Sequence, residues 1–203
     1  MKHIDKIIEP KGLKYARDYH LTWDEFHNQC SDMYIACREQ AYSEQKGECA
    51  YTGLPLTGNV IIHLDHFKKK SIYPRLTFEW SNLFAAVKDN HFGADYKDNQ
   101  INGRNAAHYY QLLINPALES PEAYFWYSND GMVHPKDGLT QTDVEKANTT
   151  ILLLNLNQST LIHRRRELWK MIQNYKDLPI DTIASALKNY GFSFVIYSYQ
   201  SPT

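Results

Sequence analysis

The sequence predicts an α+β fold in which a small strand-strand-helix unit lies between mostly helical segments. Two short apolar runs, at residues 59–64 and 83–87, have the composition of buried strands. Residues 89–97 begin with cap-forming side chains and continue in a pattern typical of a helix. Segments without Gly or Pro, with apolar residues near helical spacing, stand on both sides of this unit.

The composition suits a single packed domain. The chain has 203 residues, of which 43% are hydrophobic, and this is enough for one core. We expect one domain over residues 1–203, with the strand-strand-helix unit at about 59–97 and helical extensions at 1–48 and 100–203. The sequence contains no internal repeat and no low-complexity segment.

Charge and cysteine content narrow the class of protein. A formal net charge of −1 argues against a protein that coats nucleic acid, so any such contact must be local or helped by a partner. Three scattered cysteines are too few for a disulfide framework. The N-terminus lacks an apolar signal segment, and no apolar run approaches the ~20 residues that span a bilayer. We expect a cytoplasmic protein without a membrane anchor.

The first predicted helix covers residues 22–45, with Thr22 as its N-cap. Cys30 and Cys37 are seven positions apart on it, so they share a face but lie two turns from each other. Because this separation is too large for both to bind one ion, we expect them to be small buried apolar residues. Gly47 is expected to close the helix.

The central unit is predicted in the order strand, loop, strand, helix. The first strand covers residues 59–64 and the second covers residues 83–87. Asp89 and Asn90 then offer caps for a helix that begins near His91.

The C-terminal half is predicted to be mainly helical. A short helix is expected at 105–114, a hairpin turn at 129–131, and two longer helices at 143–156 and 159–174. The last of these carries Arg164, Arg165 and Arg166, for which partner contacts or a solvated face are expected. Residues 192–197 are expected to form a strand or an extended tail.

Three residues stand out by their spacing. Fifteen residues separate His66 from Asn82, and eight separate Asn82 from His91. Hydrolysis of a phosphodiester requires a water made nucleophilic, and a neutral imidazole with a pKa near 6.5 can take that proton at neutral pH. The spacing and context therefore predict His66 as a general base.

The negative charge that gathers on phosphate oxygens during this reaction is stabilised by a hard divalent cation. Asp65 supplies a carboxylate ligand and His91 a nitrogen from the facing helix, since adjacent strand residues such as Asp65 and His66 point in different directions. We expect one ion, Mg²⁺ or Mn²⁺, with Zn²⁺ or Ni²⁺ as alternatives. Asn82 is expected to pin the loop so that a backbone carbonyl orients His66 and fixes its tautomer.

Other polar residues lie near this set. Lys68, Lys69 and Lys70 follow the predicted base, where a nucleic-acid backbone would lie, although a lysine run is also typical of a solvated loop. His63 shares a strand face with Asp65, so it is a candidate nucleic-acid contact or a group that supports the metal ligands, with core packing as the alternative.

The histidine, asparagine and histidine, in these contexts, resemble the HNH (ββα-metal) nuclease superfamily. Four longer blocks between Glu44 and Trp169 are similar to the HNH proteins of Septu-type and retron-linked bacterial antiphage defence: EQKGECAYTG, HLDHFKKKSIYPRLTFEWSNLFAA, LLINPALESPEAYF and NTTILLLNLNQSTLIHRRRELW. The resemblance implies a ββα-metal unit, a nuclease with a defensive role and a larger ATPase subunit as partner. DNA is the expected substrate, and the sequence leaves the choice between DNA and RNA open.

The chain departs from that family at a zinc knuckle of two Cys-x-x-Cys pairs. The four positions are occupied by Cys49, Thr52, Val87 and Asn90, so only one of the four cysteines is present. One thiolate cannot build a tetrahedral structural zinc site, so none is expected. Packing of Tyr51, Leu54 and Val87 is expected to replace it.

A second function stays open. The fold could serve as a catalytically weak interaction subunit that binds an ATPase through its flanking helices. The intact Asp65, His66, Asn82 and His91 set argues for the enzyme, whereas the lost knuckle argues weakly for the interaction subunit.

Overall fold

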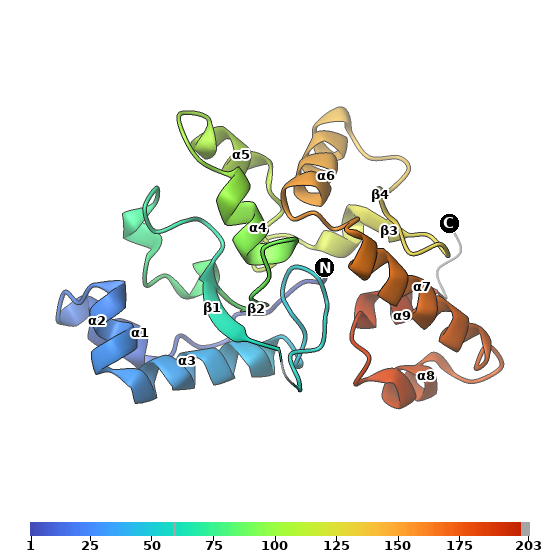
Figure 1. Ribbon diagram of the computed structural model, residues 1–203, viewed down its shortest axis with the longest axis horizontal. Helices are drawn as coiled ribbons and strands as arrows, with labels where there is room; N and C mark the ends of the chain where they lie inside the picture. Colours follow the sequence, from blue (N-terminus) through green and yellow to red (C-terminus); the bar gives the residue numbers. More distant parts are fainter. Residues whose placement is uncertain (59, 200–203) are drawn as a thin grey trace.

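The computed structural model describes residues 1–58 and 60–199. Within them, helices surround two small antiparallel sheets, so the predicted α+β class is confirmed (Figure 1). The sheets pair β1 (Ile62–His66) with β2 (Leu83–Val87), and β3 (Phe125–Tyr127) with β4 (Val133–Pro135). The helices are α1 (Lys11–Asp18), α2 (Trp23–Gln29), α3 (Ser31–Glu44), α4 (Gly93–Gln100), α5 (Ala106–Leu112), α6 (Gln141–Leu153), α7 (Ser159–Gln173), α8 (Ile180–Leu187) and α9 (Ser193–Ser198), with short 3-10 helices η1 (Pro74–Leu76), η2 (Trp80–Asn82) and η3 (Pro121–Ala123).

The β1–β2 hairpin lies between α3 and α4, both of which pack against it (Figure 1). Strand β2 has the predicted bounds of residues 83–87, and all five residues are buried. Strand β1 begins later than predicted and extends through His66; the predicted first residue, Asn59, lies outside the described residues. The register pairs Ile62 with Val87 and His66 with Leu83, so the Asp65-His66 end of β1 lies beside the start of β2.

The predicted helix over residues 22–45 is divided in two. Thr22 caps α2 as predicted, in a capping box with Glu25: each backbone N–H donates to the other's side chain. Cys30 then leaves helical geometry, with φ −117° and ψ 45°, and so separates α2 from α3. Cys37 is buried as predicted, whereas Cys30 is only partly buried. Gly47 has a φ of +74° in the turn that follows α3.

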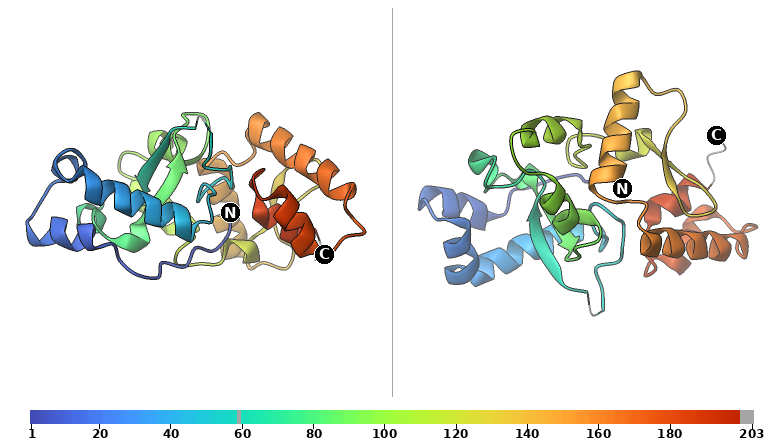
Figure 2. Two further views of the ribbon diagram at one scale, coloured as in Figure 1. Left: turned by 90° about the horizontal axis from the view of Figure 1, so that it is seen from below. Right: turned by 45° about the horizontal axis from the view of Figure 1, so that its top comes forward.

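The C-terminal half follows the predictions up to α7 and departs from them afterwards. Helices α5, α6 and α7 and the β3–β4 turn lie where they were predicted. Residues 192–197 were predicted as a strand or an extended tail, but they form most of α9, so this prediction is wrong. Helix α8 was not predicted. Figure 2 shows α1–α3 at one end of the molecule and α7–α9 at the other.

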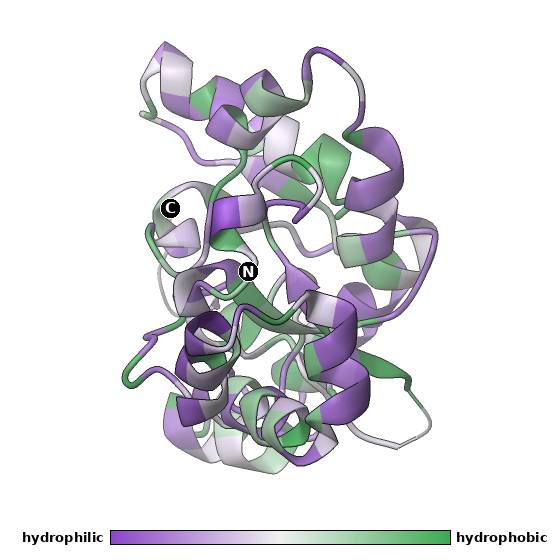
Figure 3. Cartoon of the chain, turned by 90° about the vertical axis from the view of Figure 1, so that its left-hand side faces the viewer, coloured by the Kyte–Doolittle hydropathy of each residue, from purple (hydrophilic) through white to green (hydrophobic). Residues whose placement is uncertain are grey.

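Burial separates residues that look alike in the sequence. The helices carry polar and apolar residues along their whole length, as the hydropathy colours show (Figure 3). Arg165 was expected on a solvated or partner-binding face, but its side chain is buried and donates to the carbonyls of Gly131 and Leu156. That expectation is therefore wrong for Arg165. In the described part of the chain, the helices are too short or too polar to cross a membrane.

Candidate functional site

Asp65 and His66 are the last two residues of β1, and their side chains leave opposite faces of the strand. The imidazole of His66 packs edge-on against Trp23, with ring centroids 4.3 Å apart. The carboxylate of Asp65 instead points toward Tyr51 and Lys97. Both residues are buried, with 6% of Asp65 and 8% of His66 exposed. The strand end therefore places a carboxylate and an imidazole side by side in the chain but in different surroundings.

The hydrogen bond of His66 defines which ring nitrogen is available. Nε2 lies 2.9 Å from the carbonyl oxygen of Thr77. Because a carbonyl only accepts, Nε2 carries the proton and Nδ1 keeps its lone pair. Nδ1 has no hydrogen-bond partner among residues 1–58 and 60–199, and it is not one of the polar atoms sealed from solvent. Burial lowers the pKa of His66 despite the bond to Thr77, so the ring is neutral at pH 7.

Asn82 ties together the two ends of the loop that supplies the Thr77 carbonyl. Its Oδ1 accepts from the backbone N–H of Lys68 at 2.8 Å. Its Nδ2 donates to the carbonyls of Lys68 and Leu76, each at 3.1 Å. Thr77 follows Leu76 directly, so the amide of Asn82 holds the loop at the point where it meets His66. The catalytic role predicted for Asn82 stays a prediction.

Asp65 is held in its charged form by its neighbours. Burial opposes ionisation, but the Lys97 ammonium, His63 and Tyr51 together hold the pKa of Asp65 well below its usual range. The Tyr51 hydroxyl donates to Oδ2, and Nζ of Lys97 lies 3.6 Å from the same oxygen. Oδ1 accepts no hydrogen bond within the described chain and retains contact with solvent, with Nε2 of His63 at 3.8 Å. Oδ1 is thus the Asp65 oxygen without a hydrogen bond in the described chain, and His63 is its ion-pair partner.

In the described part of the chain His91 makes no hydrogen bond or ion pair with Asp65, and its role as a metal ligand stays a prediction. It is exposed in the turn before α4, where its N–H donates to Asp89 and its carbonyl accepts from Asn155. Helix α4 begins at Gly93, so the predicted helix start near His91 lies two residues too early and the predicted caps do not act on α4. The residue of α4 that reaches Asp65 is Lys97.

The donor set bears on which metal the site could hold. Among the residues that the structure describes, no cluster of three or more His, Cys, Asp or Glu side chains could hold an ion. One open carboxylate oxygen with water as the remaining ligands suits a hard ion such as Mg²⁺, which keeps several waters. Zn²⁺, which prefers three or four protein ligands, and Ni²⁺ stay the alternatives. The residues present therefore fit Mg²⁺ or Mn²⁺ at Oδ1 of Asp65, with His91 as an unplaced second ligand.

Lys97 is the residue that the sequence-based prediction missed. Its side chain is fully buried, and Nζ donates to the carbonyls of His66 and Phe67 at 3.0 Å each. Burial alone would lower the pKa of Lys97, but the carboxylates of Asp65 and Asp98 raise it above its ordinary value. Lysine in a short helix is normally solvated, so nothing in the local sequence marks this one as buried.

The three lysines after His66 differ in their availability. Nζ of Lys69 donates to two backbone carbonyls at the end of α4, and its contact with phosphate stays a prediction. Nζ of Lys70 is paired with Asp24 at 3.2 Å on the surface, and Lys68 lies over the ring of Tyr73. Lys68 and Lys70 can therefore still reach a phosphate. Nδ1 of His63 is buried without a partner, and contact of this residue with nucleic acid stays a prediction.

Three of the four positions at which the resemblance implies a zinc knuckle are buried, whereas the fourth, Asn90, is exposed. Cys49, Thr52 and Val87 are all buried. Tyr51 and Leu54 are buried beside them, as the sequence predicted. Tyr51 also contributes the hydroxyl that donates to Asp65, so it links this packing to the candidate site.

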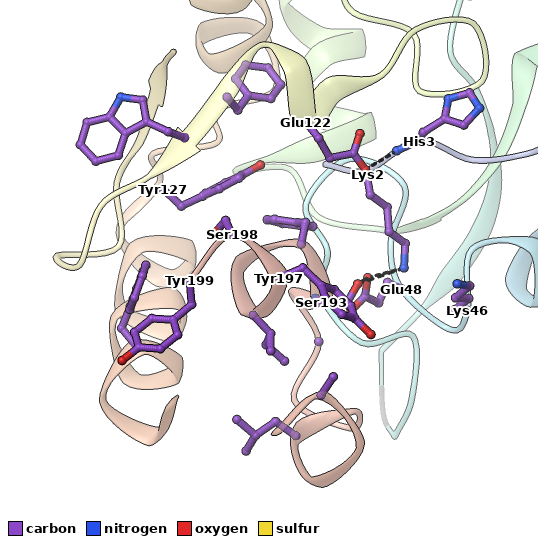
Figure 4. Close-up of a pocket in the computed structure, with 18 of the residues that line it drawn as sticks. Lys2, His3, Lys46, Glu48, Glu122, Tyr127, Ser193, Tyr197, Ser198 and Tyr199 are labelled. Carbon is purple, nitrogen blue, oxygen red and sulfur yellow. Dashed lines mark hydrogen bonds and ion pairs between the residues drawn. The ribbon is translucent and has the colours of Figure 1, made fainter. Parts of the chain in front are cut away.

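A large pocket lies away from these residues (Figure 4). Its volume is about 1390 Å³, and it is lined by the N-terminus, the β3–β4 hairpin and helices α7 to α9. Some of its polar lining residues pair with each other (Figure 4). Lys2 forms an ion pair with Glu48 at 2.7 Å, and the backbone N–H of His3 donates a hydrogen bond to Glu122. None of the candidate catalytic or metal-binding residues lines it.

Comparison with known proteins adds no assignment. No protein-family model matches the chain, and no curated protein matches it either.

Proposed function

We propose that this protein is a metal-dependent endonuclease of the HNH type that hydrolyses phosphodiester bonds in nucleic acid, with DNA as the expected substrate. The observation that carries the proposal is the orientation of His66. Its Nε2 donates to the Thr77 carbonyl, Asn82 holds the loop that bears this carbonyl, and Nδ1 keeps its lone pair and meets solvent. A neutral imidazole that is oriented through one nitrogen and keeps a lone pair on the other is suited to act as a general base.

The chemistry follows from the two faces of the strand end. Nδ1 of His66 takes a proton from a water molecule, whose oxygen attacks phosphorus as the bond to the leaving sugar oxygen breaks. The Thr77 carbonyl stabilises the resulting imidazolium through Nε2–H. Asp65 would hold a divalent ion through Oδ1, and that ion supplies charge stabilisation at the phosphate oxygens. Lys68 and Lys70 would contact backbone phosphates.

The order of elements supports a ββα-metal unit as the frame of this site. Strands β1 and β2 form an antiparallel hairpin, and α4 follows and packs on β2. The hairpin places Asn82 and His66 at the same end. The larger ATPase partner and the role in antiphage defence rest on the sequence resemblance, and co-purification with the product of a neighbouring gene would test them.

A second candidate is a catalytically weak interaction subunit with the same fold. The observation that favours it is the position of His91, which is exposed and makes no contact with Asp65 in the described chain. The nuclease assignment requires that Asp65 and His91 share one ion, or that Asp65 and water alone bind it.

Plasmid nicking separates the two candidates. The protein is incubated with plasmid DNA and with RNA in Mg²⁺ or Mn²⁺, beside a His66→Ala variant. We expect His66→Ala to lose ~10²–10⁴-fold in rate while its fold and metal binding stay close to the parent. The matched control is His108→Ala, since His108 is exposed and lies outside the site. If His66→Ala cleaves as fast as the parent under saturating Mn²⁺, His66 is not the base and the interaction subunit is the better interpretation.

A further inference from the structure

The ammonium of Lys97 lies among four oxygen atoms and 5.9 Å from the centre of the Tyr110 ring. Nζ lies 2.6 Å from Oδ1 of Asp98, 3.0 Å from the carbonyls of His66 and Phe67, and 3.6 Å from Oδ2 of Asp65. No part of the side chain is exposed. Two carboxylates and two carbonyls are the kind of oxygen cage that a protein builds around a cation, and here a lysine ammonium lies within it.

Three of these four oxygens belong to consecutive residues at the end of β1. An exposed lysine loses little by moving, whereas a buried charge must keep its partners because leaving them unpaired is costly. The contacts to the carbonyls of His66 and Phe67 are made to the main chain, so they hold the backbone itself. The contact to Asp65 engages Oδ2 and leaves Oδ1 open.

We propose that Lys97 is the positioning residue of the candidate nuclease centre. Its ammonium holds the main chain at the end of β1 and the Oδ2 side of Asp65, so that the His66 imidazole and Oδ1 of Asp65 keep the orientations described above. The proposal rests on the proposed function. Lys97 touches neither the substrate water nor the cation, and it acts through Asp65 and His66.

Arg165 provides a matched control for the loss of a buried cation. It is 1% exposed and also donates to two main-chain carbonyls, those of Gly131 and Leu156. These belong to the β3–β4 turn and to the segment before α7, and Arg165 has no contact with Asp65 or His66. Lys97→Met and Arg165→Met therefore remove the same charge and similar hydrogen bonds from two different places.

The experiment compares Lys97→Met, Arg165→Met and the parent full-length chain below the melting temperatures of both variants. We expect both variants to melt at lower temperature than the parent. Only Lys97→Met should lose activity, by about 10- to 100-fold in kcat with KM nearly unchanged. Only Lys97→Met should weaken Mn²⁺ binding in calorimetry and shift the imidazole ¹⁵N signals of His66, which report the tautomer without requiring turnover.

A second variant keeps the test decisive if Lys97→Met does not fold. Lys97→Arg retains the charge but places its donors differently, and we expect the same fall in kcat and the same shift of the His66 signals. The proposal is overturned if the folded Lys97 variant has the kcat, the Mn²⁺ affinity and the His66 signals of the parent. The nuclease assignment would still stand in that case. If the parent itself cleaves no nucleic acid, the proposed function fails. The ¹⁵N signals then still test Lys97: a shift of the His66 signals in the variant supports its positioning role, and unchanged signals contradict it.

Discussion

Two buried cations brace two different regions of this molecule, and they are paired in different ways. Lys97, beside the β1–β2 hairpin, contacts two carboxylates as well as two carbonyls, and its pKa is raised above the ordinary value. Arg165, in the C-terminal half, has carbonyl and amide oxygens as its hydrogen-bond acceptors, and burial lowers its pKa to about 10. Both side chains are inaccessible to solvent.

The two regions differ in whether an ionised carboxylate lies beside the buried cation. The carbonyls of Gly131 and Leu156 beside Arg165 are neutral, and both accept hydrogen bonds from it. Asp65 beside Lys97 is a charged group with one oxygen still open. Because Asp65 is ionised and its Oδ1 accepts no hydrogen bond in the described chain, the hairpin region is the one where we expect function.

The largest effect is expected from breaking the charge pair itself. Asp65→Ala should lower the free energy of unfolding by about 3–5 kcal/mol, because it leaves the Lys97 ammonium buried without one of its partners. It should also weaken Mn²⁺ binding. Chemical denaturation and calorimetry measure the two effects. The double variant Asp65→Ala/Lys97→Met should be more stable than Asp65→Ala; a double variant less stable than both single variants would show that the pair is not coupled.

In the C-terminal region, Gly131→Ala should be purely structural. Gly131 has a φ of +92°, and a Cβ at this position would lie 2.2 Å from the carbonyl oxygen of Ile162. Since the contact is with backbone, α7 must shift, and we expect a loss of about 3 kcal/mol. Mn²⁺ affinity and kcat, measured where the variant is folded, should equal those of the parent. A change in either would show that the two regions are coupled.

One asparagine in each region uses its side-chain amide in the same way: it accepts from the backbone N–H and donates to the backbone carbonyl of a single residue. Asn82 does so with Lys68, and Asn157 does so with Val133 in β4. We expect Asn82→Ala and Asn157→Ala each to cost about 1–3 kcal/mol of stability. Only Asn82→Ala should also lower kcat, by about 10- to 100-fold, through a mispositioned His66. Nicking rates and melting curves of the two variants test this, and equal kcat values would contradict it.

The smallest expected effect is a pH dependence from His66. Burial lowers its pKa in the folded state, so the unfolded chain takes up this proton at higher pH than the folded one. The stability that neutral His66 contributes is therefore complete above about pH 6.5 and is lost as pH falls through the folded pKa. The plateau of kcat at high pH should extend to below pH 6.5, and kcat should fall only when His66 becomes protonated at lower pH. NMR titration of the imidazole gives the midpoint, and a value above 6.5 would contradict the burial argument.

The sequence determined the elements whose signals are local. Strand β2 has the predicted bounds because five consecutive apolar residues require burial on both faces. The Thr22 cap, the turn at residues 129–131 and helix α7 also follow from nearby residues. Likewise, the link between His66 and a loop held by Asn82 could be inferred from their spacing and from what an imidazole needs to be oriented.

The tertiary structure alone decided which polar residues are buried and against what. Residues 192–197 have strand composition, yet they form a helix because Phe194, Val195 and Ile196 bury themselves against the rest of the C-terminal half. The contact of Lys97 with Asp65 has the same origin. Burial and pairing of a charge depend on groups from distant segments that surround it, and no local pattern specifies that environment.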